Sequence, residues 1–259
     1  MGGRMRFASL GSGSEGNALL VEVGTTRLLL DCGFGLAEAT RRLARLGVTP
    51  QELSAIVVTH EHQDHIGGVA RFARKHKLPV WLTTGTLRGL EGLFDDDVEV
   101  ILVRGYASFA VGDILVEPFP VPHDAREPAQ YVFSDGARRL GVLTDAGHAT
   151  GHMHRCLTRC DALVLECNHD AELLRAGDYP EKLKARIASR FGHLDNEAAG
   201  ALLAGLDRSR LQHVVAAHLS QSNNRPELAR SALATALGCA LHWIAIADQH
   251  AGLDWRQLG

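Results

Sequence analysis

Long apolar runs are absent from this sequence. No stretch reaches the eighteen or more apolar residues that a membrane-spanning helix needs, and the N-terminal segment has no apolar stretch of the length that a signal peptide requires. Cysteines are few and form no CxxC pair, so we expect all five to be reduced thiols: Cys32, Cys156, Cys160, Cys167 and Cys239. These absences predict a cytoplasmic protein with no membrane partner.

An excess of positive charge is also lacking. The 27 lysines and arginines are outnumbered by 30 aspartates and glutamates, which gives a net charge of -3 and a pI of about 6.5. A protein that grips nucleic acid over its whole surface is usually basic, so any such contact here needs a local patch or bound metal ions. The sequence does contain 14 histidines. Histidine is the commonest metal ligand, and several of these residues follow a pattern typical of a metal site.

The 259 residues show no linker, low-complexity stretch or internal repeat, which predicts one domain over residues 1–259. Short apolar runs predict strands over 6–10, 18–23, 27–31, 55–59, 80–82, 98–103, 114–118, 129–134, 139–144, 162–166, 214–217 and 241–245. Helical patterns predict helices over 36–46, 66–77, 86–93, 180–190, 196–206 and 226–237. Two β-rich halves that each carry helices predict an α/β protein, in which helices cover both outer faces of a pair of sheets.

The strongest motif is a run of potential metal ligands between an apolar strand and an amphipathic helix. It reads Thr59-His60-Glu61-His62-Gln63-Asp64-His65-Ile66-Gly67-Gly68. On a helix His60 and His62 would point apart, whereas a tight loop at the carboxyl end of a strand turns all four ligands inward, where open α/β sheets place their sites. His60 and His62 suit one ion, and Asp64 and His65 suit a second; the glycine pair lets a neighbouring backbone approach closely. A histidine-rich surface loop is the plain alternative.

Four side chains from one loop are incomplete for two ions, so we expect further ligands at other strand ends. Three residues fit: His123 after the predicted strand 114–118, Asp145 after 139–144, and His218 after 214–217. The two oxygens of Asp145 are suited to bridging cations about 3.5–4 Å apart. Each residue taken alone is more often a cap or turn residue. Together with the HxHxDH motif they indicate a two-metal centre.

The order of these ligands along the chain resembles the metallo-β-lactamase superfamily, and the resemblance covers nearly the whole chain. It implies the four-layer αββα sandwich of that superfamily. It also implies a first metal site from His60, His62 and His123, and a second from Asp64, His65 and His218. Asp145 is then expected to bridge the ions, with a hydroxide between them. Asp31 matches the superfamily's early strand-end aspartate and is expected to orient a ligand histidine; a simple turn residue is the alternative.

Five blocks narrow the resemblance to the YycJ/WalJ branch, which is related to the PhnP and RNase Z branches. They are LGSGSEGN at 10–17, HDAREP at 123–128, LECNHD at 165–170, FGHLDN at 191–196 and HLSQSNN at 218–224. In the RNase Z and PhnP branches the histidine that matches His193 approaches the scissile phosphate and acts as a general acid. Glu166 resembles the acidic partner of that histidine. The alternatives are a helix cap for His193 and a strand-end salt bridge for Glu166.

The resemblance therefore implies that the catalytic residues are His193, Glu166 and Asp64. Other polar residues are weaker candidates. Asn17, Asn223 and Asn224 are able to position phosphates, although such residues are usually turn formers. His148 is a candidate for a place near the site, and Arg126, Arg186 and Arg190 for a local basic rim, but the sequence does not place these arginines on one face.

Phosphodiester cleavage agrees with this chemistry, because two divalent ions would polarise the phosphoryl group while a metal-held hydroxide attacks it. The segment between His123 and Asp145 is too short for the long arm of RNase Z. The segment between Asp145 and His218 is too short for the inserted domain of RNase J-like nucleases. The YycJ resemblance of this bare catalytic core implies a DNA exonuclease acting from 5′ ends, with DNA or another phosphodiester as its partner.

Other functions remain open at this point. A small-molecule cyclic phosphodiesterase like PhnP is mildly favoured by the negative net charge. A thioester hydrolase like glyoxalase II uses the same seven ligands, but its third motif is rich in Thr-Pro-Gly-His, unlike residues 123–128. True β-lactamase activity is disfavoured, because those enzymes are exported and this chain has no signal. A redox di-iron protein usually has a carboxylate in place of the histidine at His62. A degenerate fold used as a binding module is disfavoured because every expected ligand is present.

The predicted cofactors are two divalent metal ions. The ligand set of imidazoles and carboxylates contains no thiolate, which suits Zn²⁺ or Mn²⁺ and also Fe²⁺. The sequence does not distinguish among these metals, and it does not predict the oligomeric state.

Overall fold

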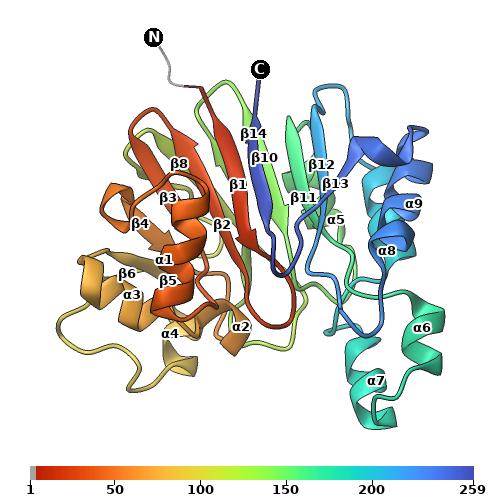
Figure 1. Ribbon diagram of the computed structural model, residues 1–259, viewed down its shortest axis with the longest axis horizontal. Coiled ribbons are helices and arrows are strands. Elements are labelled where there is room, and N and C mark those ends of the chain that lie inside the picture. The colour runs from red at the N-terminus through yellow and green to blue at the C-terminus, as the bar shows by residue number, and fades with distance from the viewer. Residues whose placement is uncertain (1–3) are drawn as a thin grey trace.

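Most strands of the protein are rich in apolar residues and largely buried, as expected for strands that are covered on both faces. In the computed structural model, which describes residues 4–259, β2 (Ala18–Val23) and β9 (Ala129–Ser134) are buried throughout. The strands form two seven-stranded sheets with helices on their outer faces, so the predicted αββα architecture is confirmed (Figure 1). Residues 1–3 of the predicted domain lie outside the described residues, and the number of domains stays a prediction.

The first sheet has the order β14-β1-β2-β3-β4-β5-β6. Its other strands are β1 (Arg6–Gly11), β3 (Thr26–Leu30), β4 (Ala55–Val57), β5 (Val80–Thr83), β6 (Val100–Val103) and β14 (Leu253–Gln257). The second has the order β13-β12-β11-β10-β9-β8-β7, with β7 (Phe109–Val111), β8 (Ile114–Pro120), β10 (Arg139–Leu143), β11 (Ala162–Glu166), β12 (His213–Ala217) and β13 (Ile244–Ile246). Strands β3 to β6 run parallel, as do β10 to β13. In each sheet their carboxyl ends therefore share one edge.

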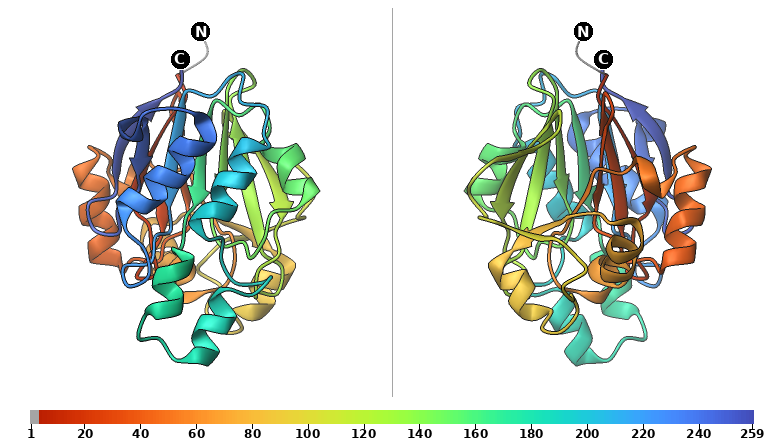
Figure 2. Two further views of the ribbon diagram at one scale, coloured as in Figure 1. Left: turned by 90° about the vertical axis from the view of Figure 1, so that its right-hand side faces the viewer. Right: turned by 90° about the vertical axis from the view of Figure 1, so that its left-hand side faces the viewer.

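Three apolar layers fill the molecule, because side chains alternate between the faces of each strand. Phe7 and Val21 pack between the sheets, whereas Leu20 and Leu29 face the outer helices. The first sheet is covered by α1 (Leu36–Arg45) and α3 (Val69–His76). The second sheet is covered by α5 (Gly151–Leu157), α8 (Asn196–Ala204) and α9 (Pro226–Leu237), and Figure 2 shows both covers.

Shorter helices gather at the edge of the sandwich opposite the C-terminus (Figures 1 and 2). They are α2 (Gln63–Ile66), α4 (Thr84–Gly89), α6 (Ala171–Ala176) and α7 (Glu181–Ile187). Two 3-10 turns, η1 (Pro50–Glu52) and η2 (Leu241–Trp243), complete the elements. Within residues 4–259, no helix has both the length and the apolar character that crossing a membrane requires.

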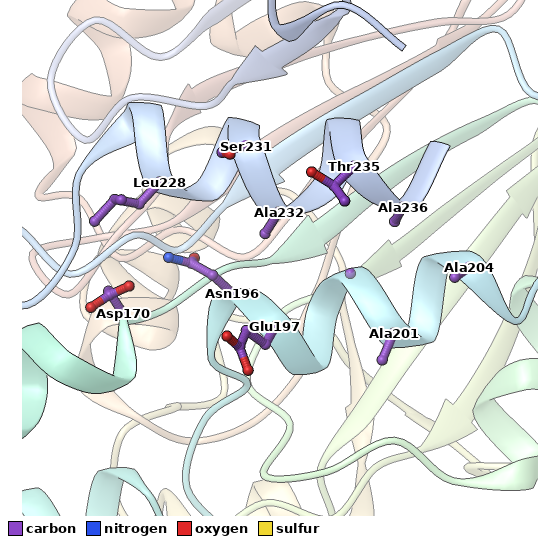
Figure 3. A pocket seen from close by; sticks show the side chains of 11 residues that line it. Asp170, Asn196, Glu197, Ala201, Ala204, Leu228, Ser231, Ala232, Thr235 and Ala236 are labelled. Carbon is purple, nitrogen blue, oxygen red and sulfur yellow. The ribbon is translucent and has the colours of Figure 1, made fainter. Parts of the chain in front are cut away.

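Helices α8 and α9 pack closely on the outer face of the second sheet. A Cβ atom added to Gly200 would lie 3.1 Å from the carbonyl oxygen of Ala232, so only glycine allows this approach without a shift. Figure 3 shows the groove between the two helices, which has a volume of about 470 Å³ and is lined largely by small side chains such as Ala201 and Ala204. None of the residues that line this groove belongs to the predicted site.

The structure corrects several predicted elements. The predicted helix 66–77 is broken, because α2 ends at Ile66 and α3 begins at Val69. A Cβ on Gly68 would lie 1.8 Å from the carbonyl oxygen of Phe34, so the glycine pair does admit a neighbouring backbone. The predicted strand 241–245 is wrong over its first three residues, which form η2. Four elements, β7, β14, α5 and α6, lie in segments for which no strand or helix was predicted.

Candidate metal centre

The predicted site residues lie where strands end, at one edge of the sandwich. Asp31 follows β3, Asp145 follows β10, and His218 follows β12, while Glu166 is the last residue of β11. Parallel strands place their carboxyl ends together, which brings side chains from distant parts of the chain to one place. Asp31, Asp145 and His218 have backbone φ angles of 60°, 54° and 54°. This left-handed conformation is uncommon for residues with a side chain, and such strain is typical of functional sites.

The motif after β4 adopts a form that differs from a plain loop. His60 is fully buried in the connection, and His62 is the N-cap of α2, so that Asp64 and His65 lie on a single helical turn. His65 accordingly turns inward and is buried, whereas the carboxylate of Asp64 reaches the same centre from a partly exposed position. The loop and the helical turn together direct all four side chains to one cluster.

The first predicted ligand group, His60, His62 and His123, comes together at the end of β4 and after β8. A potential ligand atom from each residue lies within 4.8 Å of those from the others. His62 Nδ1 lies 3.2 Å from His123 Nε2. The fold thus brings His123, some sixty residues further along the chain, to the two histidines of the HxHxDH motif.

The second predicted group, Asp64, His65 and His218, also comes together. Asp64 Oδ2 lies 3.4 Å from His65 Nε2 and 3.2 Å from His218 Nε2. Asp145 lies between the two groups, with Oδ2 at 3.0 Å from His65 Nε2 and Oδ1 at 3.9 Å from His123 Nε2. One carboxylate thus reaches a histidine of each group, which is the arrangement that the predicted bridging role requires.

Each of the five predicted ligand histidines uses one ring nitrogen for a contact with the surrounding scaffold. The partners are Thr59 Oγ1 for His60, the Asp124 carbonyl for His62, Asp31 for His65, the Gly192 carbonyl for His123 and Glu166 for His218. A carbonyl or carboxylate partner accepts a hydrogen bond from one ring nitrogen, so the other nitrogen of the same ring faces the cluster. Asp31 Oδ2 accepts from His65 Nδ1 at 2.8 Å. Such partners fix the orientation and tautomer of a ligand histidine.

The donor set fits divalent metal ions. Among the described residues, His60 Nε2 is a buried atom without a hydrogen-bond partner, which is costly unless another group satisfies it. Burial alone would raise the pKa of Asp145, but the His218 and His65 imidazoles outweigh it and hold that pKa well below its usual range. Burial would lower the pKa of His65, but Asp145, Asp64 and Asp31 raise it. Asp145 and His65 therefore hold opposite charges. A bound cation would take the place of the imidazole proton and would supply the positive charge that the carboxylates attract.

His193 and Glu166 form a pair beside the cluster. His193 Nδ1 donates to Glu166 Oε1 at 2.7 Å, and His193 Nε2 has no partner within residues 4–259. Burial would lower the pKa of His193, but the charge of Glu166 and this hydrogen bond raise it. Burial would raise the pKa of Glu166, and His193 instead lowers it to about 2. Glu166 Oε2 also accepts from the Ala146 and Leu194 amides, so the carboxylate is fixed in place.

The loop 11–17 contacts the second group of predicted ligands. These supporting contacts were not predicted from the sequence. Asn17 Nδ2 donates to Asp64 Oδ2 at 3.2 Å, while its Oδ1 accepts from Ser12 Oγ at 3.0 Å. Ser12 Oγ in turn accepts from the His218 amide at 2.9 Å. Asn17 thus contacts a predicted ligand rather than a phosphate position. The Gly-Ser-Gly-Ser-Glu-Gly-Asn block was a visible signal, but its contacts depend on the folded loop.

The remaining weaker candidates lie outside the cluster. Asn224 donates to the Cys167 carbonyl at 2.7 Å and pairs with Asn196, and Asn223 is buried beside Ser220, so both have structural partners. His148 contacts the Arg190 carbonyl at 2.9 Å. These residues belong to none of the groups of potential ligand atoms described above.

A cavity of about 410 Å³ opens over the cluster. Its inner wall contains predicted site residues, namely His62, Asp64, Asp145, His193 and His218. Its outer wall is formed by Tyr179 and by Leu183, Arg186 and Ile187 of α7. Of the three arginines predicted as a possible basic rim, Arg186 lines this cavity, whereas Arg126 and Arg190 do not. Arg190 contacts His148 instead.

A family model described as "Beta-lactamase superfamily domain" matches residues 26–218, the segment that carries the cluster. The chain belongs to the beta-lactamase superfamily. Within this superfamily it is 39% identical over 239 residues to the exodeoxyribonuclease YycJ of Bacillus anthracis, covering 90% of this chain and 89% of that protein. It is 34% identical over 256 residues to the exodeoxyribonuclease WalJ of Streptococcus pneumoniae, covering 97% and 92%.

The solved structures agree with the superfamily fold. The metallo-beta-lactamase fold protein YhfI of Bacillus subtilis superimposes with a TM-score of 0.76 at 18% identity, over 97% of this chain and 99% of that chain. At this identity the likeness concerns the fold alone. The sequence matches go further: they show an enzyme of the YycJ/WalJ type, a hydrolase of the metallo-β-lactamase superfamily with relatives named as nucleases.

Proposed function

We propose that this enzyme hydrolyses phosphodiester bonds of DNA from strand ends, with two divalent metal ions. The observation that carries the proposal is the placement of the His193–Glu166 pair at one cavity with two ligand groups that share Asp145. In this proposal His60, His62 and His123 hold one ion, and Asp64, His65 and His218 hold the other. The names of the YycJ and WalJ relatives support DNA as the substrate.

The metal ions, when bound, would polarise the phosphoryl group and lower the pKa of water. The attacking water oxygen forms a bond to phosphorus, and the bond between phosphorus and the leaving oxygen breaks. The proton of the water passes to the Asp64 carboxylate, whose Oδ1 has no hydrogen bond within the described residues. The proton on His193 Nε2 passes to the leaving oxygen, and Glu166 stabilises the imidazolium before this transfer. General acid catalysis of this kind contributes about 10²–10⁴-fold.

The test compares three substrates with Mn²⁺ or Zn²⁺ added: a 5′-labelled DNA duplex, bis-p-nitrophenyl phosphate and a thioester. We expect cleavage of the duplex from one end. His193→Ala should retain its metal and lose about 10²–10⁴-fold in kcat, since it lacks the proton donor. His242→Ala is the matched control, because His242 is exposed and lies outside the cluster.

Each other outcome has a defined meaning. Turnover of the small diester alone would replace DNA by a small-molecule substrate, as in the PhnP-like alternative. Turnover of the thioester alone would refute the phosphodiesterase proposal. Loss of metal from His193→Ala would make His193 a ligand rather than the proton donor.

A further inference from the structure

The outer wall of the cavity comes from a part of the chain that does not belong to the sandwich. Figure 1 shows α7 beyond the edge where the strands end, and both views of Figure 2 agree. Helix α7 has no fully buried residue, and Leu183 and Ile187 are half-buried against the cavity. Helix α7 therefore presents its half-buried side to the cavity rather than to the core between the sheets.

Among the residues that the structure describes, Arg186 is the one lysine or arginine that lines this cavity. Its Nε donates to Asp124 Oδ2 at 2.6 Å, and the Asp124 carbonyl accepts from His62 Nε2 at 3.2 Å. Asp124 therefore contacts both Arg186 and the predicted ligand His62, and it fixes the position of one relative to the other. Within residues 4–259 its two terminal nitrogens have no hydrogen-bond partner, and 57% of the side chain is exposed.

Tyr179 stands on the same wall, before the start of α7. It is half-buried, and its hydroxyl has no hydrogen-bond partner among the described residues. Asp64, Asp124 and Asp145 contribute carboxylates to the lining. Apart from those of the outer wall, the other polar side chains there are three imidazoles and the neutral groups of Ser14 and Gln63. The three carboxylates would repel a phosphate that extends beyond the reach of the metal ions, and the guanidinium of Arg186 on the outer wall would attract it.

We propose that Arg186 and Tyr179 form a second binding site, which takes the part of a single nucleic-acid strand next to the scissile bond. The terminal nitrogens of Arg186 bind the neighbouring, non-reacting phosphate, and the ring of Tyr179 stacks on a base. Guanidinium groups match phosphate oxygens in a bidentate geometry, and aromatic rings bind bases without sequence preference. This inference rests on the proposed function, because it assigns the remainder of the same substrate. It makes the enzyme prefer a polymer over a small diester.

Arg186→Gln tests the phosphate contact, with Arg190→Gln as the matched control on an exposed arginine outside the cavity lining. We measure KM and kcat on a 5′-phosphorylated oligodeoxythymidylate and on bis-p-nitrophenyl phosphate, which has no second phosphate. Arg186→Gln should raise KM for the oligonucleotide by about tenfold or more, and this loss should exceed the loss on the small diester. Arg190→Gln should show no such difference between the two substrates.

The salt dependence of strand binding distinguishes a direct phosphate contact by Arg186 from a purely structural role. The slope of log affinity against log salt should fall by about 0.7 in Arg186→Gln, the value for one phosphate contact on a single strand. Arg186→Lys keeps the charge and should recover most of that slope, although not the full affinity. Metal content, measured beside these values, should equal that of the wild type. Tyr179→Ala should weaken binding by about fivefold or more through lost stacking, and Tyr179→Phe should not.

Equilibrium binding keeps this inference distinct from the proposed function. Fluorescence anisotropy with the labelled oligodeoxythymidylate and the metal-loaded protein does not require cleavage. Strand binding that weakens in Arg186→Gln, in a protein that hydrolyses only the small diester, would support this site while refuting DNA hydrolysis. DNA hydrolysis with an Arg186→Gln variant that matches the wild type in KM and salt slope would overturn this site and leave the proposed function intact. No binding of the strand at all would overturn the site as well.

Discussion

At the scale of single residues, the cluster depends on contacts that lie just behind the predicted ligands. Each of the five predicted ligand histidines contacts the scaffold through one ring nitrogen, and the side-chain amide of Asn17 donates to Asp64. Asn17 is itself fixed, because its Oδ1 accepts from Ser12 Oγ and from the Gly13 amide. Its buried side chain therefore presents a donor to Asp64 Oδ2 without rotational freedom. Partners of this kind raise metal affinity by holding a ligand in its binding orientation.

Asn17→Ala should weaken metal binding by about 10–100-fold, the usual effect of removing a partner of a metal ligand. The physical reason is that the Asp64 carboxylate loses its donor and becomes free to turn away from His65 and His218. The affinity is measured by competition with a chelator, followed by metal analysis of the dialysed protein. The affected ion should be the one held by Asp64.

Glu15→Gln is the matched control, since Glu15 lies on the same loop with an exposed side chain. It should retain the affinity of the wild type. An Asn17→Ala protein that folds and binds metal as tightly as this control would show that Asn17 does not position Asp64.

That the predicted ligands would lie close together was foreseeable from sequence, because each follows the apolar run of a strand and strand ends meet at one edge of the sandwich. The roles of Ser12 and Asn17 were not, since a Gly-rich loop gives no periodicity that fixes where its side chains point. Arg186 is a similar case. Its sequence neighbours suggest an ordinary charged helix face, and only the fold places it across from His62 through Asp124.

At the scale of elements, three neighbouring strands of the first sheet share one charged side chain. Glu22 on β2 is opposite Arg6 of β1 and Arg27 of β3. Its carboxylate oxygens lie 2.6 Å from Arg6 Nε and 2.5 Å from Arg27 Nε. Burial alone would raise the pKa of Glu22, but the hydrogen bonds to Arg6 and Arg27 outweigh it and lower that pKa. The ion pairs thus link the three strands across the sheet.

Glu22→Gln should lower the free energy of unfolding by about 1–2 kcal/mol at neutral pH, because hydrogen bonds to charged groups are worth more than neutral ones and both arginines are partly exposed. A carboxyl with a lowered pKa stabilises the folded state above its unfolded pKa of about 4.5. That stabilisation is lost as the pH falls through the folded value. The difference between the two proteins should therefore shrink on acidification, as urea unfolding at several pH values will measure.

Glu117→Gln provides the comparison for Glu22→Gln. Within residues 4–259, Glu117 forms an ion pair with Arg139 alone, at 3.0 Å, and it is more exposed than Glu22. Its effect should stay below about 1 kcal/mol. A difference between Glu22→Gln and the wild type that grows as the pH falls below 4.5 would contradict the assigned charge of Glu22.

Most strands and outer helices were predictable because their apolar patterns are long. The elements that the sequence analysis missed are short or depend on distant pairing. β14 reads Leu-Asp-Trp-Arg-Gln and is largely exposed, and its pairing with β1 spans almost the whole chain. α5 reads Gly-His-Met-His-Arg-Cys-Leu, which buries only Met153 and Leu157. Tertiary contacts, rather than local propensity, decide such segments.

At the scale of the whole molecule, the predicted ligands tie the two sheets together. Asp64 and His65 follow β4 of the first sheet, whereas His123, Asp145 and His218 follow strands of the second. Asp145 Oδ2 lies 3.0 Å from His65 Nε2 across this boundary. Ions held here would be bound by both halves at once, so an unfolded chain could not bind them in the same way. Binding to the native state alone stabilises a protein by mass action.

Removal of metal should therefore lower Tm for the whole protein rather than loosen one loop. An ion present at 100 times its Kd adds about 2.7 kcal/mol to the free energy of unfolding, so a chelator should lower Tm by several degrees, and Zn²⁺ or Mn²⁺ should restore it. Calorimetry on the dialysed and reloaded protein measures both steps. Asp145→Ala serves as the insensitive control, because it lacks the carboxylate between the two groups and should respond weakly to either addition. If a chelator removes all metal, as confirmed by elemental analysis, and Tm stays constant, the ions do not join the two sheets, and the ligands must then be sought on one sheet alone.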